Sequence, residues 1–504
     1  MKQKRWKTDG YLRIFASYYR PHWKLFALDM VCALCICLVD LAFPIVSRFS
    51  MQTLLPGQMF TAFFVVMAVL AGAYVLKGCF YYIITYWGHL LGVRMEADIR
   101  RDLFSHMQDL SFSFYDKNRT GQLMSRVTGD LFEITELAHH GPEDLFISSI
   151  TILGAFCVML TIRWELALIV FAVIPLFILF TTLCRKRMMR ASTEVKAKLA
   201  GINGEVESSI SGMRTAKAFA NEAAESAKFD QANDQFRGAK RGYYRAMAFY
   251  QSGMEFFMGI LSVVVIAFGG FLLMRGRMDL IDLTTFFLYI STFITPIRKL
   301  SAFVEQFMQG MAGFKRFVAL MRVEPDIQDE PDAQELTDVK GDIRVEDVTF
   351  RYEPSDPPVL EHVTLHVRPG ETVAVVGPSG GGKSTLCQLI PRFYDVTGGR
   401  VLVDGKDVRT LTQHSLRANI GIVQQDVFLF AGTIYDNIRY GRPDATEAEI
   451  VEAAKRAEIY DDILDMPDGF QTQVGERGAM LSGGQKQRVS IARIFLKNPP
   501  VLIL

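Results

Sequence analysis

The eight residues Gly377-Pro-Ser-Gly-Gly-Gly-Lys-Ser384 decide how the second half of this chain folds. They fit the pattern G-x-x-x-x-G-K-[ST], follow a β-branched run at 371–376 and precede a helical TLCQLIPRFY. We therefore predict a strand, a phosphate-binding loop and a helix, in that order. The glycines let backbone N–H groups turn inward, Lys383 brings a mobile positive charge to the β and γ phosphates, and Ser384 offers Mg²⁺ a hydroxyl. A chance glycine-rich turn would lack this context.

A second glycine-rich segment, Leu481-Ser-Gly-Gly-Gln485, opens a helical KQRVSIARIFL. Ser482 is well placed as the N-cap, and Gly483 and Gly484 expose backbone N–H groups, so this is another potential anion site. Alone, the segment could equally be an ordinary capped helix. Because it accompanies a P-loop, we favour anion binding.

The first half of the chain is membrane-like. Of 504 residues, 50% are hydrophobic and 22% charged, and the mean hydropathy is +0.18, too apolar for an ordinary soluble protein. Crossing ~30 Å of hydrocarbon takes about 20 helical residues. We expect the second span to continue past the bilayer as a helix. Six segments are long enough to cross, near 25–47, 60–91, 144–162, 164–184, 249–273 and 281–304.

The distribution of Lys and Arg predicts the orientation. Residues 1–24, 92–143 and 185–248 together carry 26 of them, whereas the loops on the opposite side carry four. By the positive-inside rule, the N-terminus and everything after the sixth span face the cytoplasm of a cell membrane. The overall net charge of only +1 excludes a nucleic-acid binder that works through a bulk positive field.

After the sixth span, residues 322–340 carry seven acidic residues and two prolines without a helical stripe, which indicates a linker. Short β-branched runs then predict strands at 343–350, 359–367 and 400–403, followed by helices. We predict a multi-domain membrane protein in four parts: a cytoplasmic segment (1–24), a six-helix all-α transmembrane domain (25–321), the linker (322–340) and an α/β P-loop ATPase domain (341–504).

With these motifs, residues 341–504 resemble an ABC transporter nucleotide-binding domain, and the first 320 residues resemble the membrane domain of ABC exporters. Besides the P-loop and LSGGQ, the resemblance rests on Tyr352 in TFRY, Gln425 in IGIVQQD and Gly475-Glu-Arg-Gly478. Of two adjacent glutamines, Gln425 is preferred because the family's glutamine precedes an acidic residue, here Asp426. An aromatic residue at a strand end, such as Tyr352, is more often simply packed.

The resemblance implies ATP and Mg²⁺ as cofactors and a dimer in which each ATP lies between the P-loop of one copy and the LSGGQ of the other. Tyr352 would stack on adenine, Ser384 and Gln425 would hold the metal, and Lys383, Gln425 and Ser482 would form the catalytic set. Both motifs are intact, which favours a homodimer over a heterodimer. The implied nucleotide-binding residues are Tyr352, Gly377, Pro378, Ser379, Gly380, Gly381, Gly382, Lys383, Ser384, Thr385, Ser482, Gly483, Gly484 and Gln485.

The resemblance further implies a half-transporter that uses ATP to export a hydrophobic or amphipathic compound, drug-like or lipid. The alternatives are a nucleotide-gated or regulatory membrane subunit and an inactive partner of a heterodimeric exporter. Segments 111–130 and 212–233 resemble the family's cytoplasmic coupling loops, although either could be a solvated charged loop.

Several residues inside the spans could serve function or packing. Cys32, Cys35 and Cys37 occupy different helix faces and favour apolar packing over metal binding. Ionisable groups at membrane depth, Asp40, Lys77 and Glu255, are each a candidate for lining a substrate path. Two aromatic pairs, Phe256-Phe257 and Phe286-Phe287, could line a cavity, but lipid-facing packing is favoured.

The chain ends at Val501-Leu-Ile-Leu504, where the family pattern continues into an acidic pair and a switch histidine. The expected Mg²⁺-ordering aspartate, water-polarising glutamate and histidine therefore lie beyond this sequence. We expect a truncated chain with an incomplete nucleotide domain that hydrolyses ATP poorly, and whose last strand finds its sheet neighbours in the missing part.

Overall fold

The computed structural model describes residues 6, 8–425, 427–475, 478 and 480–504, without the side chains of residues 293, 294, 301, 302 and 305. The chain forms two compact units. The first comprises Met1–Ser105 and Met124–Arg322, and the second comprises His106–Leu123 and Val323–Leu504. Residues between two predicted spans thus belong to the same unit as the predicted nucleotide-binding region.

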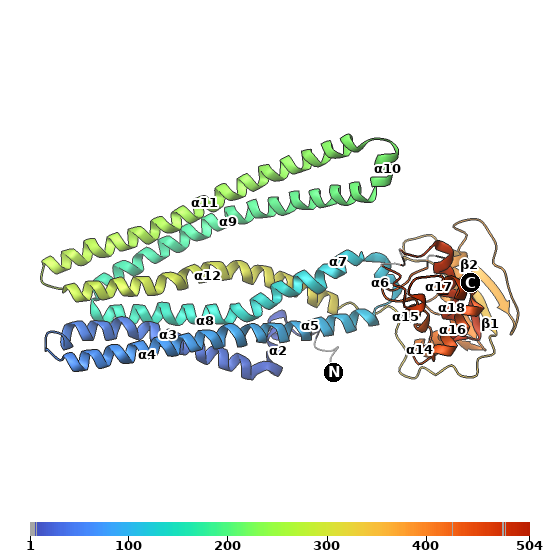
Figure 1. Cartoon of the computed structure of the whole chain (residues 1–504), viewed down its shortest axis with the longest axis horizontal. Coiled ribbons are helices and arrows are strands. Elements are labelled where there is room, and N and C mark those ends of the chain that lie inside the picture. The colour runs from blue at the N-terminus through green and yellow to red at the C-terminus, as the bar shows by residue number, and fades with distance from the viewer. Residues whose placement is uncertain (1–5, 7, 426, 476–477, 479) are drawn as a thin grey trace. The chain divides into compact units, whose positions relative to one another are not determined.

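The first unit is a set of long helices that lie side by side (Figure 1). Its elements are α2 (Tyr11–Ser17), α3 (Trp23–Phe49), η2 (Ser50–Leu54), α4 (Phe60–Ile83), η3 (Ile84–Gly88), α5 (His89–Asp109), η4 (Arg126–Asp130), α8 (Leu131–Ile162), α9 (Trp164–Ser211), α10 (Met213–Ala218), α11 (Glu222–Met274) and α12 (Leu280–Met321). Helix α9 packs along α11 and α8 packs along α12, while the short α10 joins the ends of α9 and α11.

Six of the described helices are long and apolar enough to cross a membrane, which confirms the six predicted spans. The second continues as expected, because α4, the π-helical turn η3 and α5 form one helical stretch from Phe60 to Asp109. Where the helices meet, large side chains such as Phe286 and Tyr289 are fully buried. The Tyr289 hydroxyl donates to the Leu41 carbonyl at 2.7 Å, which satisfies the only polar atom of that ring.

The second unit begins with a four-stranded antiparallel sheet in the order β2-β1-β3-β4. Ile343 of the central strand pairs with Val367 on one side and Val403 on the other. The prediction for 343–350 is confirmed, and those for 359–367 and 400–403 differ by one or two residues. The strands are β1 (Ile343–Phe350), β2 (Leu360–Val367), β3 (Gly398–Val403), β4 (Lys406–Asp407), β5 (Ile420–Ile422) and β6 (Val501–Ile503).

Helices dominate the rest of this unit, as predicted, and two separate hydrophobic cores support it. One core joins β1, β2 and β3 to α13 and α14, and the other is built from α15–α18. The short parallel sheet of β5 and β6, with Ile420 opposite Val501, borders the first core. The helices are α6 (Phe112–Lys117), α7 (Thr120–Ser125, at the boundary between the units), α13 (Lys383–Leu389), α14 (Gln413–Ala418), α15 (Ile434–Arg439), α16 (Glu447–Arg456), α17 (Tyr460–Leu464) and α18 (Gly483–Lys497).

Two strand predictions need correction. Residues 371–376 form no strand, and among the described residues no strand pairs with them. Val373, Val375 and Val376 are exposed there, because β-branched residues form a stable strand only where neighbours supply hydrogen bonds and apolar cover. The last strand, in contrast, has a sheet neighbour in this chain, since β6 pairs with β5.

Candidate functional site

The P-loop (residues 377–384) turns through two glycines in the left-handed region, Gly380 at φ 81° and Gly382 at φ 79°. A Cβ at Gly382 would lie 2.7 Å from Leu360 Cδ2 and 3.0 Å from the Val359 carbonyl oxygen. Both the backbone angle and the space therefore require glycine immediately before α13. This close approach anchors the loop to β2.

The ammonium group of Lys383 folds over its own loop. Its Nζ donates to the carbonyl oxygens of Gly377 at 3.0 Å and Pro378 at 2.7 Å. Neutral carbonyls are weaker partners for a cation than an ionised phosphate, so an anionic ligand can displace them. The next residue, Ser384, is exposed, as a hydroxyl that reaches a ligand or metal must be.

Tyr352 lies at the start of the P-loop helix. Its hydroxyl is 2.9 Å from Oγ1 of the buried Thr385, and its ring meets Phe350 and Tyr394 edge-on, with centroids 4.9 and 5.3 Å apart. The ring is 45% exposed. The structure thus brings two predicted nucleotide-binding residues together and leaves the ring an open surface, the arrangement that a base-stacking aromatic needs.

The LSGGQ segment (residues 481–485) is preorganised by a capping box. Ser482 Oγ accepts from the Gln485 backbone N–H, and the Gln485 side chain accepts from the Ser482 backbone N–H at 2.9 Å. This confirms Ser482 as the N-cap of α18. A Cβ at Gly483 or Gly484 would meet nothing within 4 Å, so the helix N-terminus is open to a ligand.

The two loops stand on different cores of the same unit. The P-loop precedes α13 on the β-sheet core, and LSGGQ precedes α18 on the helical core. Among the described residues, no hydrogen bond or ion pair joins the two loops. Each is therefore a separate anion site within one copy of the chain.

Gln425 follows β5 and is exposed, as is its neighbour Gln424. The acidic residue on which the choice between them depends, Asp426, lies outside the described residues, and so do Glu476 and Arg477 of the GERG segment. The choice of Gln425 stays a prediction.

Helix α6, within segment 111–130, is a packed element of the second unit. Phe112 stacks on Phe393 with ring centroids 4.2 Å apart, and Lys117 pairs with Glu353 at 2.6 Å. Tyr394 donates to Asp116, and its pKa is raised by burial and by this carboxylate. None of the residues of α6 is fully buried, so its coupling role stays a prediction. The other segment, 212–233, contains α10 and carries an exposed Phe219, and its coupling role stays a prediction.

Each of the three charged candidates inside the spans has a partner. Lys77 of α4 pairs with Asp40 of α3 and lies over the rings of Tyr74 and Tyr81. At the edge of the bundle, an exposed Glu255 pairs with Arg298 at 2.7 Å. In each pair, a charged residue of one helix is neutralised by a residue of opposite charge on another helix. A role in lining a substrate path stays a prediction.

The aromatic and cysteine residues behave mainly as packing groups. Phe286 is buried in the helical core, whereas Phe256 is 64% exposed. Cys32 and Cys37 are buried, and Cys37 contacts the Thr151 hydroxyl at 3.5 Å, which supports packing; the preference for packing over metal binding stays a prediction.

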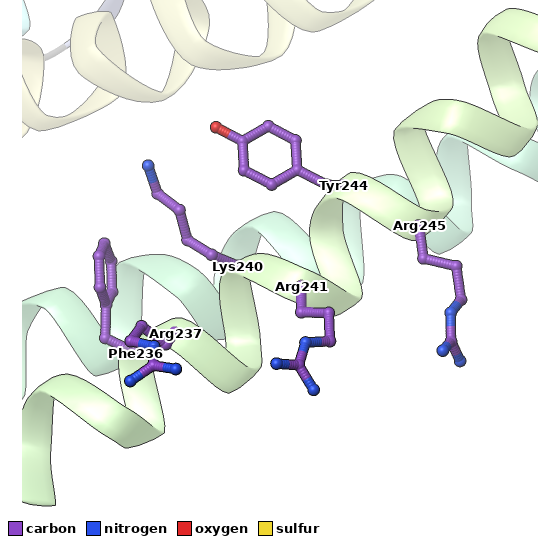
Figure 2. A pocket seen from close by; sticks show the side chains of 6 residues that line it. All are labelled: Phe236, Arg237, Lys240, Arg241, Tyr244 and Arg245. Atoms are coloured by element: carbon purple, nitrogen blue, oxygen red, sulfur yellow. The ribbon is translucent and has the colours of Figure 1, made fainter.

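An open hollow on α11 carries a concentration of positive charge. Figure 2 shows its side chains on a single helix, with Phe236, Lys240 and Tyr244 on one side and Arg237, Arg241 and Arg245 on the other. The ammonium of Lys240 lies between the rings of Phe236 and Tyr244, at 5.4 and 5.7 Å from their centroids. Within the described chain, Arg237 pairs with Asp234 while Arg241 and Arg245 have no acidic partner. We call these six residues the α11 basic surface: Phe236, Arg237, Lys240, Arg241, Tyr244 and Arg245.

Sequence reasoning missed a cluster of ionisable groups in the first unit. Asp29, His139 and Glu143 come together, and His89 and His140 lie beside them. The available signal was the spacing of His139 and Glu143, four residues apart on one helix face. Asp29 of α3 and His89 of α5 join the cluster only through helix packing, which the local sequence does not show.

Comparison with known proteins identifies the class. The family model for the ABC transporter transmembrane region matches residues 26–297, and the ABC transporter model matches residues 360–504. The chain therefore belongs to the ABC transporter family, as a half-transporter in which a membrane region is fused to an ATP-binding region, homologous to exporters.

Individual relatives agree with this assignment to the ABC transporter family. The chain is 45% identical over 493 residues to the "Uncharacterized ABC transporter ATP-binding protein YwjA" of Bacillus subtilis (strain 168), covering 98% of this chain and 86% of that protein. It is 35% identical over 488 residues to the ATP-dependent lipid A-core flippase of Syntrophus aciditrophicus (strain SB), covering 96% and 80%. A bacterial Atm1-family ABC exporter solved with ATP bound superposes with a TM-score of 0.80 at 27% identity, covering 94% of this chain and 84% of that one.

Proposed function

We propose that this protein exports a hydrophobic or amphipathic compound, drug-like or lipid, across the cytoplasmic membrane at the expense of ATP. The single observation that carries the proposal is the pair of open anion sites on separate cores of one unit, fused to six apolar helices. Two such sites are redundant in one pocket but complementary across a pair of subunits. The excess of Lys and Arg supports a cytoplasmic N-terminus and nucleotide-binding unit.

In the proposed dimer, each ATP lies between the P-loop of one copy and the LSGGQ segment of the other. Lys383 neutralises the β and γ phosphates, and Ser384 and Gln425 hold Mg²⁺. Ser482 and the N-terminus of α18 meet the γ-phosphate from the other side, while Tyr352 stacks on adenine. Because one chain carries both loops intact, two identical copies form two equal sites, so we propose a homodimer.

ATP binding would draw the two nucleotide units together, and the helical units would turn from inward-facing to outward-facing. Helix α6 is packed on the nucleotide unit and transmits this movement. We propose that α10 does the same by docking on the partner copy, at the exposed aromatic residues Phe428, Phe430 and Tyr440. The test is a disulfide between Phe219→Cys in one copy and Tyr440→Cys in the other. No ATP-sensitive cross-link would contradict this docking.

We propose that the α11 basic surface first receives the anionic head of an amphipathic substrate. Its aromatic rings suit an apolar body, and the guanidinium groups of Arg241 and Arg245 are free of acidic partners among the described residues. Arg241→Gln with Arg245→Gln should slow the transport of anionic dyes more than that of cationic dyes. Equal effects on both would contradict the assignment.

We also propose that a polypeptide ending at Leu504 binds ATP but hydrolyses it poorly. Tyr352, the P-loop and LSGGQ are in place, yet residues 371–376, which lead into the P-loop, have no strand beside them in the described chain. Transition-state electrostatics is usually the largest catalytic term, and the P-loop must be held rigidly to supply it.

The export proposal is tested with the chain extended by the C-terminal segment of the 45% identical relative, in inverted membrane vesicles with a panel of amphipathic fluorescent dyes. ATP should drive at least one dye into the vesicles against its gradient, and Lys383→Ala should abolish this. A nucleotide-gated channel would only equilibrate the dye, and that result would overturn export. Copurification with a different half-transporter, and no transport without it, would overturn the homodimer.

A further inference from the structure

A buried cluster of metal-ligand side chains joins two helices of the first unit. Asp29 lies on α3, while His139 and Glu143 lie one turn apart on α8, and one potential ligand atom from each lies within 4.8 Å of the others. The three residues are only 2%, 5% and 6% exposed. Carboxylates and imidazoles are usually placed at this depth only with partners.

These side chains lack the partners that burial requires. Asp29 Oδ1, His139 Nδ1 and Glu143 Oε2 are buried and accept or donate no hydrogen bond among the described residues. The nearby cation Lys299 is engaged by Asp144 at 2.6 Å, and the Tyr19 hydroxyl donates to the Ala138 carbonyl. Glu143 Oε2 lies 3.9 Å from His139 Nε2, which is too long for a hydrogen bond, so two carboxylates and an imidazole face one another with these three atoms unsatisfied.

Gly88 keeps the space between them open. A Cβ at this position, the last residue of η3, would lie 2.9 Å from both Asp29 Oδ1 and His139 Nδ1, and 2.2 Å from His139 Cε1. Any larger residue would push the two ligand groups apart. The π-helical turn therefore creates a cradle directly at the unpartnered atoms.

Two further imidazoles connect the buried trio to its surroundings. His89, His139 and His140 also place one ligand atom each within 4.8 Å of the others, and His89 is exposed while His140 is half-buried. The His89 Nδ1 is 2.6 Å from the Thr85 carbonyl oxygen, which can only accept a hydrogen bond. Nδ1 therefore carries the proton and Nε2 offers its lone pair, the orientation seen in metal-ligating histidines.

We propose that Asp29, His139 and Glu143 bind one divalent first-row transition ion of the Zn²⁺ or Mn²⁺ class, which enters past His89 and His140. Mixed imidazole and carboxylate ligands suit these ions, whereas Mg²⁺ prefers oxygen ligands and retains its water. The ion would neutralise the two carboxylates and tie α3 to α8. This proposal is independent of the proposed transport function.

The test uses the full chain in detergent, stripped with a chelator and free of nucleotide. Zn²⁺ and Mn²⁺ are titrated against a colorimetric chelator, with excess Mg²⁺ present, and bound metal is counted by mass spectrometry after dialysis. The wild-type protein should retain one more ion per chain than the isosteric double variant Asp29→Asn/Glu143→Gln. The wild-type affinity for the ion should exceed the affinity of Asp29→Asn alone or Glu143→Gln alone by at least about tenfold.

Gly88→Ala provides a test that leaves every ligand in place. It should lose the ion, whereas Gly78→Ala on α4, where a Cβ would meet nothing within 4 Å, should retain it. Glu133→Gln on α8 serves as the carboxylate control and should also retain the ion. Equal stoichiometry and affinity in wild type, the double variant and Gly88→Ala, or full displacement by Mg²⁺, would overturn the proposal.

Discussion

The two phosphate-binding loops of the nucleotide unit are held in different ways. LSGGQ is fixed by a capping box between residues three apart, and its helix is further tied by Arg488 to Asp462 of α17. The P-loop follows an unpaired segment, and its lysine rests on its own carbonyl oxygens. A local device thus shapes one loop, whereas the other depends on strands that come from elsewhere in the sequence.

This difference predicts which of the two loops should be more sensitive to substitution. The helical core beneath LSGGQ closes within residues 429–496, so the segment is stable without distant partners. Among the described residues, the P-loop meets β2 at Gly382, and no strand lies beside the segment that leads into the loop. Changes to the P-loop should therefore have larger consequences for nucleotide binding than equivalent changes to LSGGQ.

The largest effect is expected from Lys383→Ala. The P-loop would lose its mobile cation at the β and γ phosphates, so ATP binding should weaken by more than about tenfold and transport should stop. Binding is measured with a fluorescent ATP analogue. Lys406→Ala, an exposed lysine of β4, is the matched control and should bind normally. Normal ATP-dependent transport by the Lys383 variant would rule out this site.

The next effect concerns the segment before the P-loop. In the 504-residue protein, backbone amides of residues 372–376 should exchange with deuterium within seconds, while those of 488–496 in α18 should be protected. Adding the C-terminal segment of the 45% identical relative should protect 372–376 and raise Mg²⁺-dependent phosphate release. Comparable, Lys383-dependent turnover with and without that segment would contradict the proposed dependence on distant strands.

Two substitutions at Ser482 test separately its contact with the partner's ATP and its contribution to the stability of α18. Ser482→Arg should leave ATP binding to the P-loop near normal but block ATP-driven association of the two nucleotide units, because a bulky cation would fill the site of the partner's phosphate. Ser482→Ala should destabilise α18 by about 1 kcal/mol through loss of the cap. Light scattering and thermal unfolding measure the two effects. Undiminished association of the Arg variant would mean that the other copy's ATP does not meet LSGGQ.

The smallest effect is expected at Tyr352. Tyr352→Phe removes only the hydrogen bond to Thr385 and keeps the ring, so ATP affinity should change less than about threefold. Tyr352→Ala removes the stacking surface, so it should weaken the binding of ATP more than the binding of inorganic triphosphate, which has no base to stack. If both variants weaken ATP equally, the hydroxyl and not the ring carries the contact.

Much of this fold could be predicted from the sequence because its signals are local. The six spans follow from apolar runs, and the capping box at Ser482 follows from residue types at fixed spacing. The strand at 371–376 was predicted from β-branched content, but a strand needs partners that local sequence does not specify. Likewise, Asp29 and Glu143 are more than 100 residues apart, and only helix packing brings them together.

The central claim, that each ATP lies between two copies of the chain, is tested most directly with mixed dimers. One tagged subunit carries Lys383→Ala and the other carries Ser482→Arg, so one composite site keeps both intact loops. This dimer should retain ATP through rapid gel filtration at about half the wild-type level. A dimer of one wild-type and one doubly substituted subunit has no intact composite site, so ATP bound at its one intact P-loop should dissociate during gel filtration and none should be retained. Equal retention by the two mixed dimers, or greater retention by the second, would show that each ATP is bound within a single copy, and would contradict the account.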